Sequence, residues 1–415
     1  MSTAVETQLD LEKIRASFPA LSREIHGKPV AYLDSAASSQ RVEASLQAVD
    51  RYERRHHSNV HRGAHTLSAE ATAAYEGARA TVADFIGASD RNEVVFCRNA
   101  TEAINIVARS WGETNLGEGD RVALTVMEHH SNIVPWQQLA ERKGVEIEWI
   151  GLSENSQLDL DALDAALDKG VKLVGVTHLS NVLGTVDPLA EISRRAHAAG
   201  ALVMADGAQA APKLPLSVTD LDVDFYAMSG HKLYGPTGIG VLWARKDLLA
   251  EMPPFIGGGS MIKKVTQEGT TFADPPARFE AGTPPISQAI GLAAALRWLQ
   301  GLGMDLVNAH EREITDYALK RLAEVPGLQV FGPAPSVDRV GPVSFVIEGM
   351  HPHDVAEILD RHAVAVRSGH HCAQPLMDYL GVPATTRASF AVHTDRSEID
   401  RLIEGLLDAR RVFKL

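Results

Sequence analysis

Two short segments of the chain carry residues that could do chemistry together: one holds a carboxylate and the other a lysine. Asp206 follows the apolar run 201–205, and Lys232 ends a Ser-Gly-His-Lys turn that follows a second apolar run. A lysine amine can form a Schiff base with the aldehyde of pyridoxal phosphate (PLP), while a buried carboxylate keeps the pyridine nitrogen protonated. Taken alone, such a turn is more often a surface loop. The interpretation therefore depends on the elements around the two residues.

These elements alternate between predicted strands and predicted helices. Apolar runs of strand length turn abruptly polar at their carboxyl ends, and helical patterns that stop at glycine lie between them. An open parallel sheet binds ligands in the crevice at the carboxyl ends of its strands, so these polar residues should converge there. The predicted strands are 121–127, 172–176 and 201–205, the helices are 133–143, 159–169 and 188–199, and the converging residues are His129, Asn181, Asp206 and Lys232.

The ordered motifs resemble those of fold-type I PLP enzymes of the class V aminotransferase family. They are most similar to those of the SufS-type (group II) cysteine desulfurases of the SUF iron–sulfur assembly system. The resemblance implies a PLP-dependent enzyme that converts L-cysteine to L-alanine. It covers nearly the whole chain, and segments 31–37, 60–68, 367–373 and 386–390 carry it together with the two segments above.

The length of 415 residues leaves room for two domains. We predict an α/β fold with a large PLP-binding domain, whose mainly parallel sheet is flanked by helices, over residues 31–290. A smaller α+β C-terminal domain is expected over 291–415, because helical patterns alternate there with strands such as 343–347 and 363–366. By resemblance, residues 1–30 pack with the small domain. The stretch 252–285 is rich in Gly, Pro and Thr, which is typical of a lid, an interface segment or a disordered loop.

Charge and composition exclude several classes of protein. The net charge is −13 and no Lys/Arg cluster occurs, so we expect no nucleic-acid partner. No signal-like or membrane-spanning apolar run is present, and we expect a cytoplasmic protein without membrane contact. Two cysteines are too few for a disulfide framework and suit a reducing compartment. Cys97 lies in the apolar run 93–97 and is expected to be a buried strand residue.

The turn 98–102 offers backbone amides and hydroxyls at a predicted helix start, a setting that favours a phosphate. An ordinary helix cap at Asn99 or Thr101 is the alternative. The resemblance implies that this turn, including Ala100, cradles the PLP phosphate, with Thr101, Ser229 and His231 as side-chain donors. It also implies that Thr283 reaches the phosphate of a neighbouring subunit, and hence a homodimer with shared active sites.

Other cofactor contacts are assigned by resemblance alone. His129 is expected to stack on the pyridine ring and to carry protons, and Gln209 to hydrogen bond to the ring hydroxyl. Asn181 is expected near that hydroxyl and the substrate. Taken without the resemblance, the His129–His130 pair could also be part of a metal site or lie in an ordinary loop. No zinc spacing accompanies the pair, and we predict no metal site.

Cys372 lies in a loop with two adjacent histidines and near Arg367, a setting that favours the nucleophilic thiolate. A structural or metal-binding cysteine is the alternative. The resemblance implies that the Cys372 thiolate attacks the sulfur of the PLP-bound cysteine, which leaves a persulfide on the enzyme and releases alanine.

Arginine binds an amino-acid carboxylate better than lysine, because its planar guanidinium makes two parallel hydrogen bonds. By resemblance Arg387 is this clamp, with Arg367 as a second contributor and His61 nearby. A salt bridge between domains is the alternative for either arginine. One departure is visible at 392–394, Val-His-Thr, where relatives commonly have Tyr-Asn-Thr.

His353 precedes a predicted helix over 355–361 and reads by itself as a turn histidine facing solvent. In SufS-type enzymes that work with a zinc-bearing SufU-type carrier, a matching histidine takes a zinc coordination site from the carrier. The resemblance therefore implies a SufU-type sulfur acceptor. Rival functions are a class V transaminase, a kynureninase-like hydrolase, a selenocysteine lyase and, in another class, a catalytically silent scaffold that docks a sulfur carrier.

Overall fold

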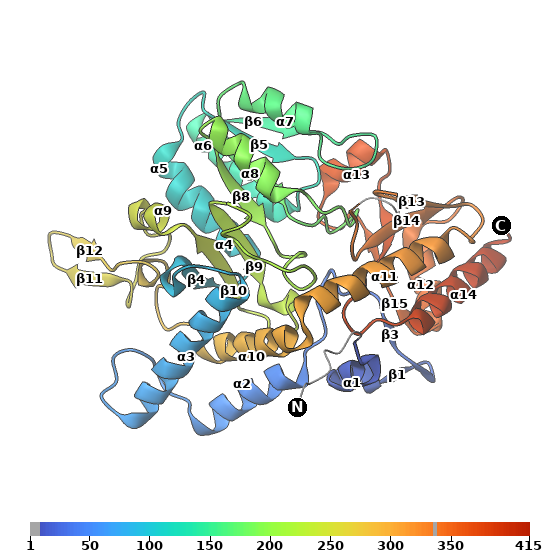
Figure 1. Cartoon of the computed structure of the whole chain (residues 1–415), viewed down its shortest axis with the longest axis horizontal. Coiled ribbons are helices and arrows are strands. Elements are labelled where there is room, and N and C mark those ends of the chain that lie inside the picture. The colour runs from blue at the N-terminus through green and yellow to red at the C-terminus, as the bar shows by residue number, and fades with distance from the viewer. Residues whose placement is uncertain (1–8, 335–337) are drawn as a thin grey trace, which may run out of the picture.

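A seven-stranded sheet forms the centre of the fold in this computed structural model, which describes residues 9–334 and 338–415 (Figure 1). The strand order is β4-β10-β9-β8-β7-β5-β6, and β10 runs antiparallel to both of its neighbours while the pairs from β9 to β6 are parallel. The strands are β4 (Val94–Cys97), β5 (Arg121–Thr125), β6 (Glu146–Ile150), β7 (Val171–Thr177), β8 (Leu202–Asp206), β9 (Phe225–Ser229) and β10 (Gly240–Ala244).

Helices cover both faces of this sheet, which explains why its central strands are nearly continuous apolar runs. Alternate side chains of β4 separate onto the two faces: Val94 and Phe96 join one core, and Val95 and Cys97 join the other. The first core is completed by α3 (Thr66–Phe85), α7 (Leu160–Leu167), α8 (Leu189–Ala198) and α10 (Ile286–Leu302), and the second by α4 (Ala100–Ile106), α6 (Val134–Lys143) and α9 (Lys246–Glu251).

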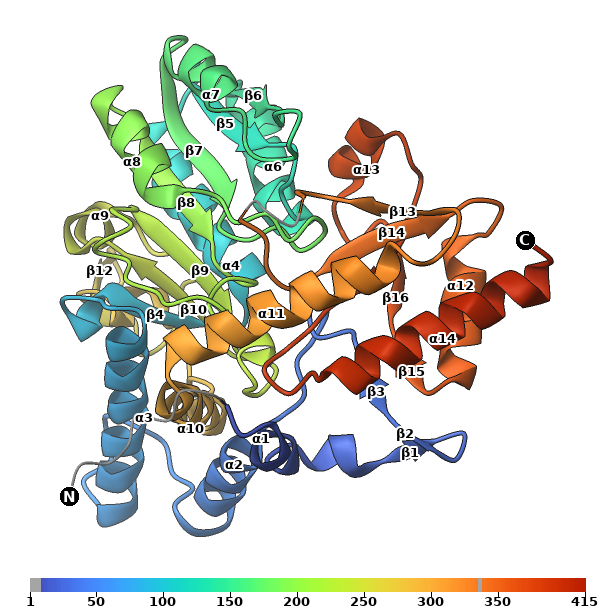
Figure 2. The ribbon, with the colours of Figure 1, turned by 45° about the vertical axis from the view of Figure 1, so that its right-hand side comes forward.

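A second, four-stranded antiparallel sheet lies beside the first (Figure 2). Its own core contains residues of the helices that pack on it. The strand order is β13 (Leu328–Phe331), β14 (Val343–Ile347), β17 (Thr385–Ala388) and β16 (Arg367–Gly369), and the helices are α11 (Met304–Leu322), α12 (Pro352–Arg361) and α14 (Arg396–Phe413).

The first part of the chain joins the second sheet's side of the molecule. The short strand β3 (Ala31–Tyr32) pairs in parallel with β15 (Val364–Ala365). In α1 (Leu11–Ala16), Arg15 forms an ion pair with Glu398 at 2.8 Å.

Our division of the chain into domains remains a proposal. Its expected boundary between 290 and 291 falls inside α10, which runs without a break to Leu302.

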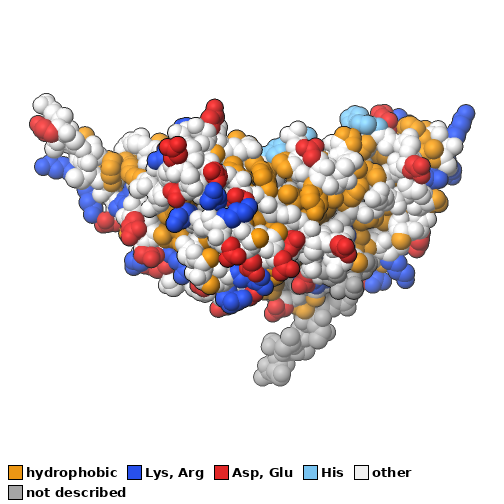
Figure 3. All heavy atoms as spheres, turned by 90° about the horizontal axis from the view of Figure 1, so that it is seen from above, with side chains coloured by type: hydrophobic (Ala, Val, Ile, Leu, Met, Phe, Trp, Pro, Cys, Tyr) orange, Lys and Arg blue, Asp and Glu red, His pale blue; other side chains and the backbone are white. Residues whose placement is uncertain are grey.

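The sequence predicted the α/β fold correctly, including the mainly parallel sheet with helices on both faces. The stretch 252–285, expected to be a long loop, contains the hairpin β11 (Ile262–Val265) and β12 (Thr270–Phe272), which extends from the body of the molecule (Figure 1). Among the described residues, no helix is both long and apolar enough to cross a membrane. On the face seen in Figure 3, acidic and basic side chains are interspersed rather than gathered into one basic patch.

A buried ion pair joins α3 to the segment after the hairpin. Arg79 donates to both carboxylate oxygens of Glu280, at 2.6 and 2.8 Å, and the two side chains are 2% and 8% exposed. Glu280 also accepts the backbone N–H of Phe96 in β4 and the hydroxyl of Tyr75. One carboxylate thus ties three elements together at an edge of the large sheet.

We expect Glu280→Ala to destabilise the protein by about 3 kcal/mol, because the buried Arg79 guanidinium loses its two shortest ion-pair bonds and keeps only the half-buried Glu76 as a charged partner. The thermal unfolding midpoint, followed by circular dichroism, should fall by several degrees. Glu251→Ala, which removes an exposed carboxylate at the end of α9, should leave the midpoint unchanged. An equal midpoint for both variants would show that Glu76 alone is a sufficient partner for Arg79.

Candidate active site

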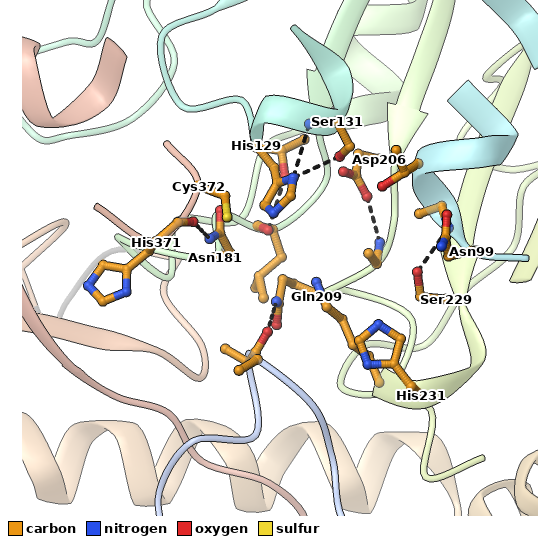
Figure 4. A pocket seen from close by; sticks show the side chains of 18 of the residues that line it. Asn99, His129, Ser131, Asn181, Asp206, Gln209, Ser229, His231, His371 and Cys372 are labelled. Atoms are coloured by element: carbon orange, nitrogen blue, oxygen red, sulfur yellow. Dashed lines mark hydrogen bonds between the residues drawn. The ribbon is translucent and has the colours of Figure 1, made fainter. Parts of the chain in front are cut away.

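A cavity of about 180 Å³ lies at the carboxyl ends of β7, β8 and β9, between the two sheets (Figure 4). It is large enough to hold on the order of ten water molecules and hence a small organic ligand. Most of the residues that we predicted from the sequence line it. They are Ala100, Thr101, His129, Asn181, Asp206, Gln209, Ser229, His231, Lys232, Arg367, Cys372 and Arg387.

Three predicted site residues lie outside this cavity. His61 is exposed and bonds to Glu76 at 3.0 Å, and Thr283 is exposed beside a separate hollow next to β4. His353 is exposed in the first turn of α12, where its backbone N–H donates to the ring of His351. The roles that the resemblance implies for these three residues remain proposals.

Asp206 is the last residue of β8, and its carboxylate accepts the backbone N–H of Ala208 at 2.9 Å. Gly207 follows because a Cβ at this position would lie 2.0 Å from the ring of Tyr226, so no other residue lets the strand end here. Burial raises the pKa of Asp206, while the charge of Lys232 opposes that shift. The carboxylate is therefore held inside the protein next to a basic group.

Lys232 ends the 3₁₀ turn η5 (Gly230–Lys232), directly after β9. Ser39 donates to the Lys232 carbonyl at 2.7 Å, which fixes the turn against the N-terminal part of the chain. Burial lowers the pKa of the Lys232 amine to about 8, with Asp206 acting in the opposite direction. A buried amine of this kind is neutral, and hence nucleophilic, at a lower pH than an exposed lysine.

The predicted phosphate turn lies at the start of α4, across the cavity from Cys372 in Figure 4. Asn99 caps the helix by accepting the N–H of Glu102 at 2.9 Å, and the Ala100 N–H donates to Ser229 Oγ at 2.9 Å. Thr101 adds a hydroxyl on the cavity wall. Ser229 Oγ accepts in its bond to Ala100, so the hydroxyls of Ser229 and Thr101 can both donate to an anion at the positive end of the helix.

His129 lies between these donors and Cys372 (Figure 4). Its Nδ1 accepts the Ser131 N–H at 3.1 Å, so the neutral ring carries its proton on Nε2. Burial is the main cause that lowers the pKa of His129 to about 3, and the charge of Lys232 adds to it. The ring is thus a flat, neutral surface at physiological pH. Ser131 was not predicted, because its role depends on a turn whose geometry the sequence does not reveal.

Gln209 and Asn181 are both oriented by backbone groups from distant segments. Gln209 Nε2 donates to the Ala36 carbonyl at 2.7 Å, and Asn181 Nδ2 donates to the His371 carbonyl at 2.8 Å (Figure 4). Both bonds use the side-chain nitrogen of the amide. The side-chain oxygen of each amide can therefore accept a hydrogen bond from a ligand in the cavity.

Arg387, in β17, is 2% exposed and incompletely paired. It donates to the Asn181 carbonyl at 3.0 Å and contacts Asp34 at 3.4 Å, while its Nε has no partner among the described residues. Burial lowers the pKa of Arg387 to about 10, which still leaves the group charged at neutral pH. A buried guanidinium with a free N–H at a cavity wall is suited to bind a carboxylate.

Asp34 is a site residue that the sequence analysis missed. Its two carboxylate oxygens contact Arg387 at 3.4 Å and Arg367 at 3.3 Å, so it orients both candidate clamps. A signal was present, because Asp34 directly follows an apolar pair in the same strand-then-carboxylate pattern that identified Asp206. The two arginines, however, lie more than 300 residues along the chain.

Cys372 belongs to a tight turn between β16 and α13 (Gln374–Leu380), and its sulfur lies on the cavity side near His129 (Figure 4). His371 and Cys372 both adopt positive φ, +52° and +57°, a strained conformation for residues other than glycine.

Three side chains at this turn could in principle hold a metal ion, since His130, His370 and Cys372 place three possible ligand atoms within 4.8 Å of one another. Both rings already use a nitrogen to accept a backbone N–H, from Gln374 and Cys372 respectively.

The donor set of the cavity fits PLP. A phosphate needs donors such as the Thr101 and Ser229 hydroxyls, and a pyridine nitrogen needs a buried carboxylate such as Asp206. An aldehyde needs a neutral amine, which Lys232 supplies through its lowered pKa. The flat ring of His129 lies between Asp206 and Cys372 (Figure 4).

Comparison with known proteins agrees with this fit. The sequence profile described as aminotransferase class-V matches residues 31–402. A probable cysteine desulfurase of Streptomyces coelicolor is 49% identical over 410 residues, 98% of each chain. A cysteine desulfurase of Dickeya dadantii is 50% identical over 397 residues, which are 95% of this chain and 96% of the relative.

Solved structures show the same likeness in three dimensions. The cysteine desulfurase of Thermococcus onnurineus superposes with a TM-score of 0.92 at 39% identity and covers all of both chains. A variant of the protein C-DES that holds glycine covalently linked to its PLP cofactor has a TM-score of 0.81 at 25% identity, over 95% of this chain and 99% of its own. This chain belongs to the class-V aminotransferase family.

Proposed function

We propose that this chain is a PLP-dependent cysteine desulfurase, which converts L-cysteine to L-alanine and takes the sulfur onto Cys372. The observation that carries the proposal is that Cys372 lines the same cavity as Lys232 and Arg387. A transaminase of the family needs the lysine and the arginine but no thiol. Full-length relatives at 49% and 50% identity bear the name of cysteine desulfurase, in agreement with this choice.

The residues of the cavity divide the work of binding. PLP, when bound, supplies an electron sink for the bond changes at the substrate carbon atoms. The Ala100 turn and Ser229 would hold its phosphate, Asp206 would keep its ring nitrogen protonated, and Lys232 would bind its aldehyde carbon. Arg387 binds the substrate carboxylate and leaves the substrate sulfur to face the Cys372 side of the cavity.

Cys372 then acts on the substrate sulfur. Its thiolate forms the new S–S bond as the substrate Cβ–S bond breaks, and the electron pair of the broken bond stays with the substrate. The substrate carbon takes up a proton and leaves as alanine, while Cys372 keeps the persulfide. Lys232 lies in the same cavity and is the basic group placed to move the substrate's protons.

Replacement of the nucleophile tests the proposal directly. We expect Cys372→Ser to bind PLP normally and to form alanine and sulfide from L-cysteine at less than about 1% of the wild-type rate, because a serine hydroxyl does not accept sulfur. Alanine is measured by chromatography and persulfide by mass spectrometry of the labelled enzyme.

Cys97→Ser is the matched control. Cys97 is buried in β4, where burial raises the pKa of its thiol above the usual range, so it carries no reactive thiolate. This variant should keep the persulfide on Cys372 and lose only stability. Persulfide on Cys97, or alanine formation by Cys372→Ser at the wild-type rate, would refute the assignment.

A second prediction concerns the capture of the cofactor. The folded-state pKa of Lys232 is lowered to about 8 from the ordinary 10.5, so the reactive neutral amine becomes the major form once the pH exceeds about 8. The rate at which cofactor-free protein recovers the absorbance of bound PLP should therefore rise with pH, with a midpoint near 8. Lys232→Ala should never show the absorbance of the covalently linked cofactor, and a midpoint near 10.5 in the wild type would show that the amine is not buried.

We further propose a SufS-type role, in which a homodimer supplies persulfide sulfur to iron–sulfur cluster assembly in the cytoplasm. His61 and Thr283 support a shared site, since both are exposed and neither reaches the cavity of its own chain. Two free cysteines suit a reducing compartment. The exposed imidazole of His353 is available to a zinc-bearing, SufU-type carrier.

The carrier proposal is tested at His353. His353→Ala should lose most of the stimulation that a zinc-loaded SufU-type carrier gives, because the variant has no imidazole to replace a carrier ligand at zinc. The reaction driven by a small-molecule thiol should continue, since His353 lies outside the Cys372 cavity. Sulfide and alanine are measured with the zinc-loaded and the zinc-free carrier. Full stimulation of the variant, or stimulation of the wild type only by the zinc-free carrier, would contradict the proposal.

A further inference from the structure

His130 contacts the Cys372 turn at two points. Its backbone N–H donates to the Cys372 carbonyl at 2.7 Å, and its ring Nε2 accepts the backbone N–H of Gln374 at 3.0 Å. The two bonds lie on either side of Ala373, so they bracket the peptide that follows the thiol. His130 is therefore joined to the turn by its main chain and by its side chain.

The turn needs external support because its backbone is strained. His371 and Cys372 both have positive φ, and residues with a Cβ keep such a conformation only where their surroundings impose it. On the other side of the turn, Asn181 donates to the His371 carbonyl at 2.8 Å, and the His371 ring bonds to Thr385. The bond from Gln374 to the His130 ring is thus one of a few side-chain contacts that hold the thiol in place.

The ring of His130 is kept in the state that this contact requires. Burial lowers the pKa of His130, and the neighbouring His370 ring lowers it further. The neutral ring has a lone pair on Nε2, and that lone pair accepts the Gln374 N–H. His370 is used in the same way, since its Nδ1 accepts the Cys372 N–H at 3.0 Å. A metal ion would have to compete with both backbone donors for these nitrogens.

We propose that His130 is a positioning residue for the nucleophile: through Gln374 and the Cys372 carbonyl it fixes the turn in the conformation that directs the Cys372 thiol into the cavity. The inference rests on the proposed function, because it assumes that Cys372 attacks the substrate sulfur. His130 is not among the residues that line the cavity, and its two hydrogen bonds to the turn are its contacts with the nucleophile's segment.

Two substitutions of similar size separate this role from a general loss of structure. His130→Gln places an amide oxygen near the position of Nε2 and should still accept the Gln374 N–H. His130→Asn is shorter and places its oxygen near the position of Nδ1, so it should lose that bond. We expect kcat for alanine formation to fall roughly threefold to tenfold in His130→Asn, the effect of one lost hydrogen bond, and to stay within about twofold of wild type in His130→Gln.

Three further readouts identify the affected step. In His130→Asn, KM for cysteine and the absorbance of bound PLP should not change, because the Arg387 and Lys232 contacts are intact. Alkylation of Cys372 by iodoacetamide in the substrate-free holoenzyme should become at least about threefold faster, as the released turn exposes the thiol. His26→Asn is the control, since His26 is exposed and bonds to Asp360 outside the cavity.

Equal kcat and equal alkylation rates in wild type and His130→Asn would overturn the positioning role. So would an equal loss in the Gln and Asn variants, which would require the imidazole itself. Stoichiometric Zn²⁺ binding to the wild-type holoenzyme that disappears in both variants would instead assign the cluster to a metal. If the wild type forms no alanine from cysteine, the proposed function fails, while the alkylation rates still report on the turn.

Discussion

A buried ion pair fixes the second sheet against the first. Lys213, in the segment after β8, donates to Glu311 of α11 at 2.9 Å and to the Phe390 carbonyl beyond β17 at 2.6 Å, and its side chain is 3% exposed. The cavity depends on this junction, because Asp206 and Lys232 come from the large sheet while Arg387 and Cys372 come from the small one. A shift of one sheet would separate the candidate carboxylate clamp from the candidate Schiff-base lysine.

The junction explains which parts of the site could be predicted from the sequence. Asp206 and Lys232 follow apolar runs, and a parallel sheet brings such strand ends together without further information. Asp34 and His130 act through contacts with segments more than 200 residues away, which no local pattern encodes. The fold was predictable for the same reason, since burial of both sheet faces leaves a strong apolar signal in β7 to β10.

The domain boundary was less predictable, because α10 shows no break at the expected position. Its Ala- and Leu-rich sequence continues the helix to Leu302, and Gly303 follows with a φ of +82°. Glycine adopts positive φ without strain, so the helix ends at this residue, while the division into domains stays a proposal. His61 and Thr283 were named by resemblance alone, and their roles stay proposals because neither residue lines the cavity of this chain.

The proposed function places two conflicting requirements on the Cys372 turn. In the proposed reaction the thiol faces the cavity to take sulfur, whereas the proposed persulfide has to be reached by a carrier protein too large to enter a cavity of about 180 Å³. A short turn with two strained residues meets both demands if few contacts hold it, because strain lowers the cost of release. Polar contacts to His130 and Asn181 suit this balance better than a packed apolar core, since water can replace them when the turn opens.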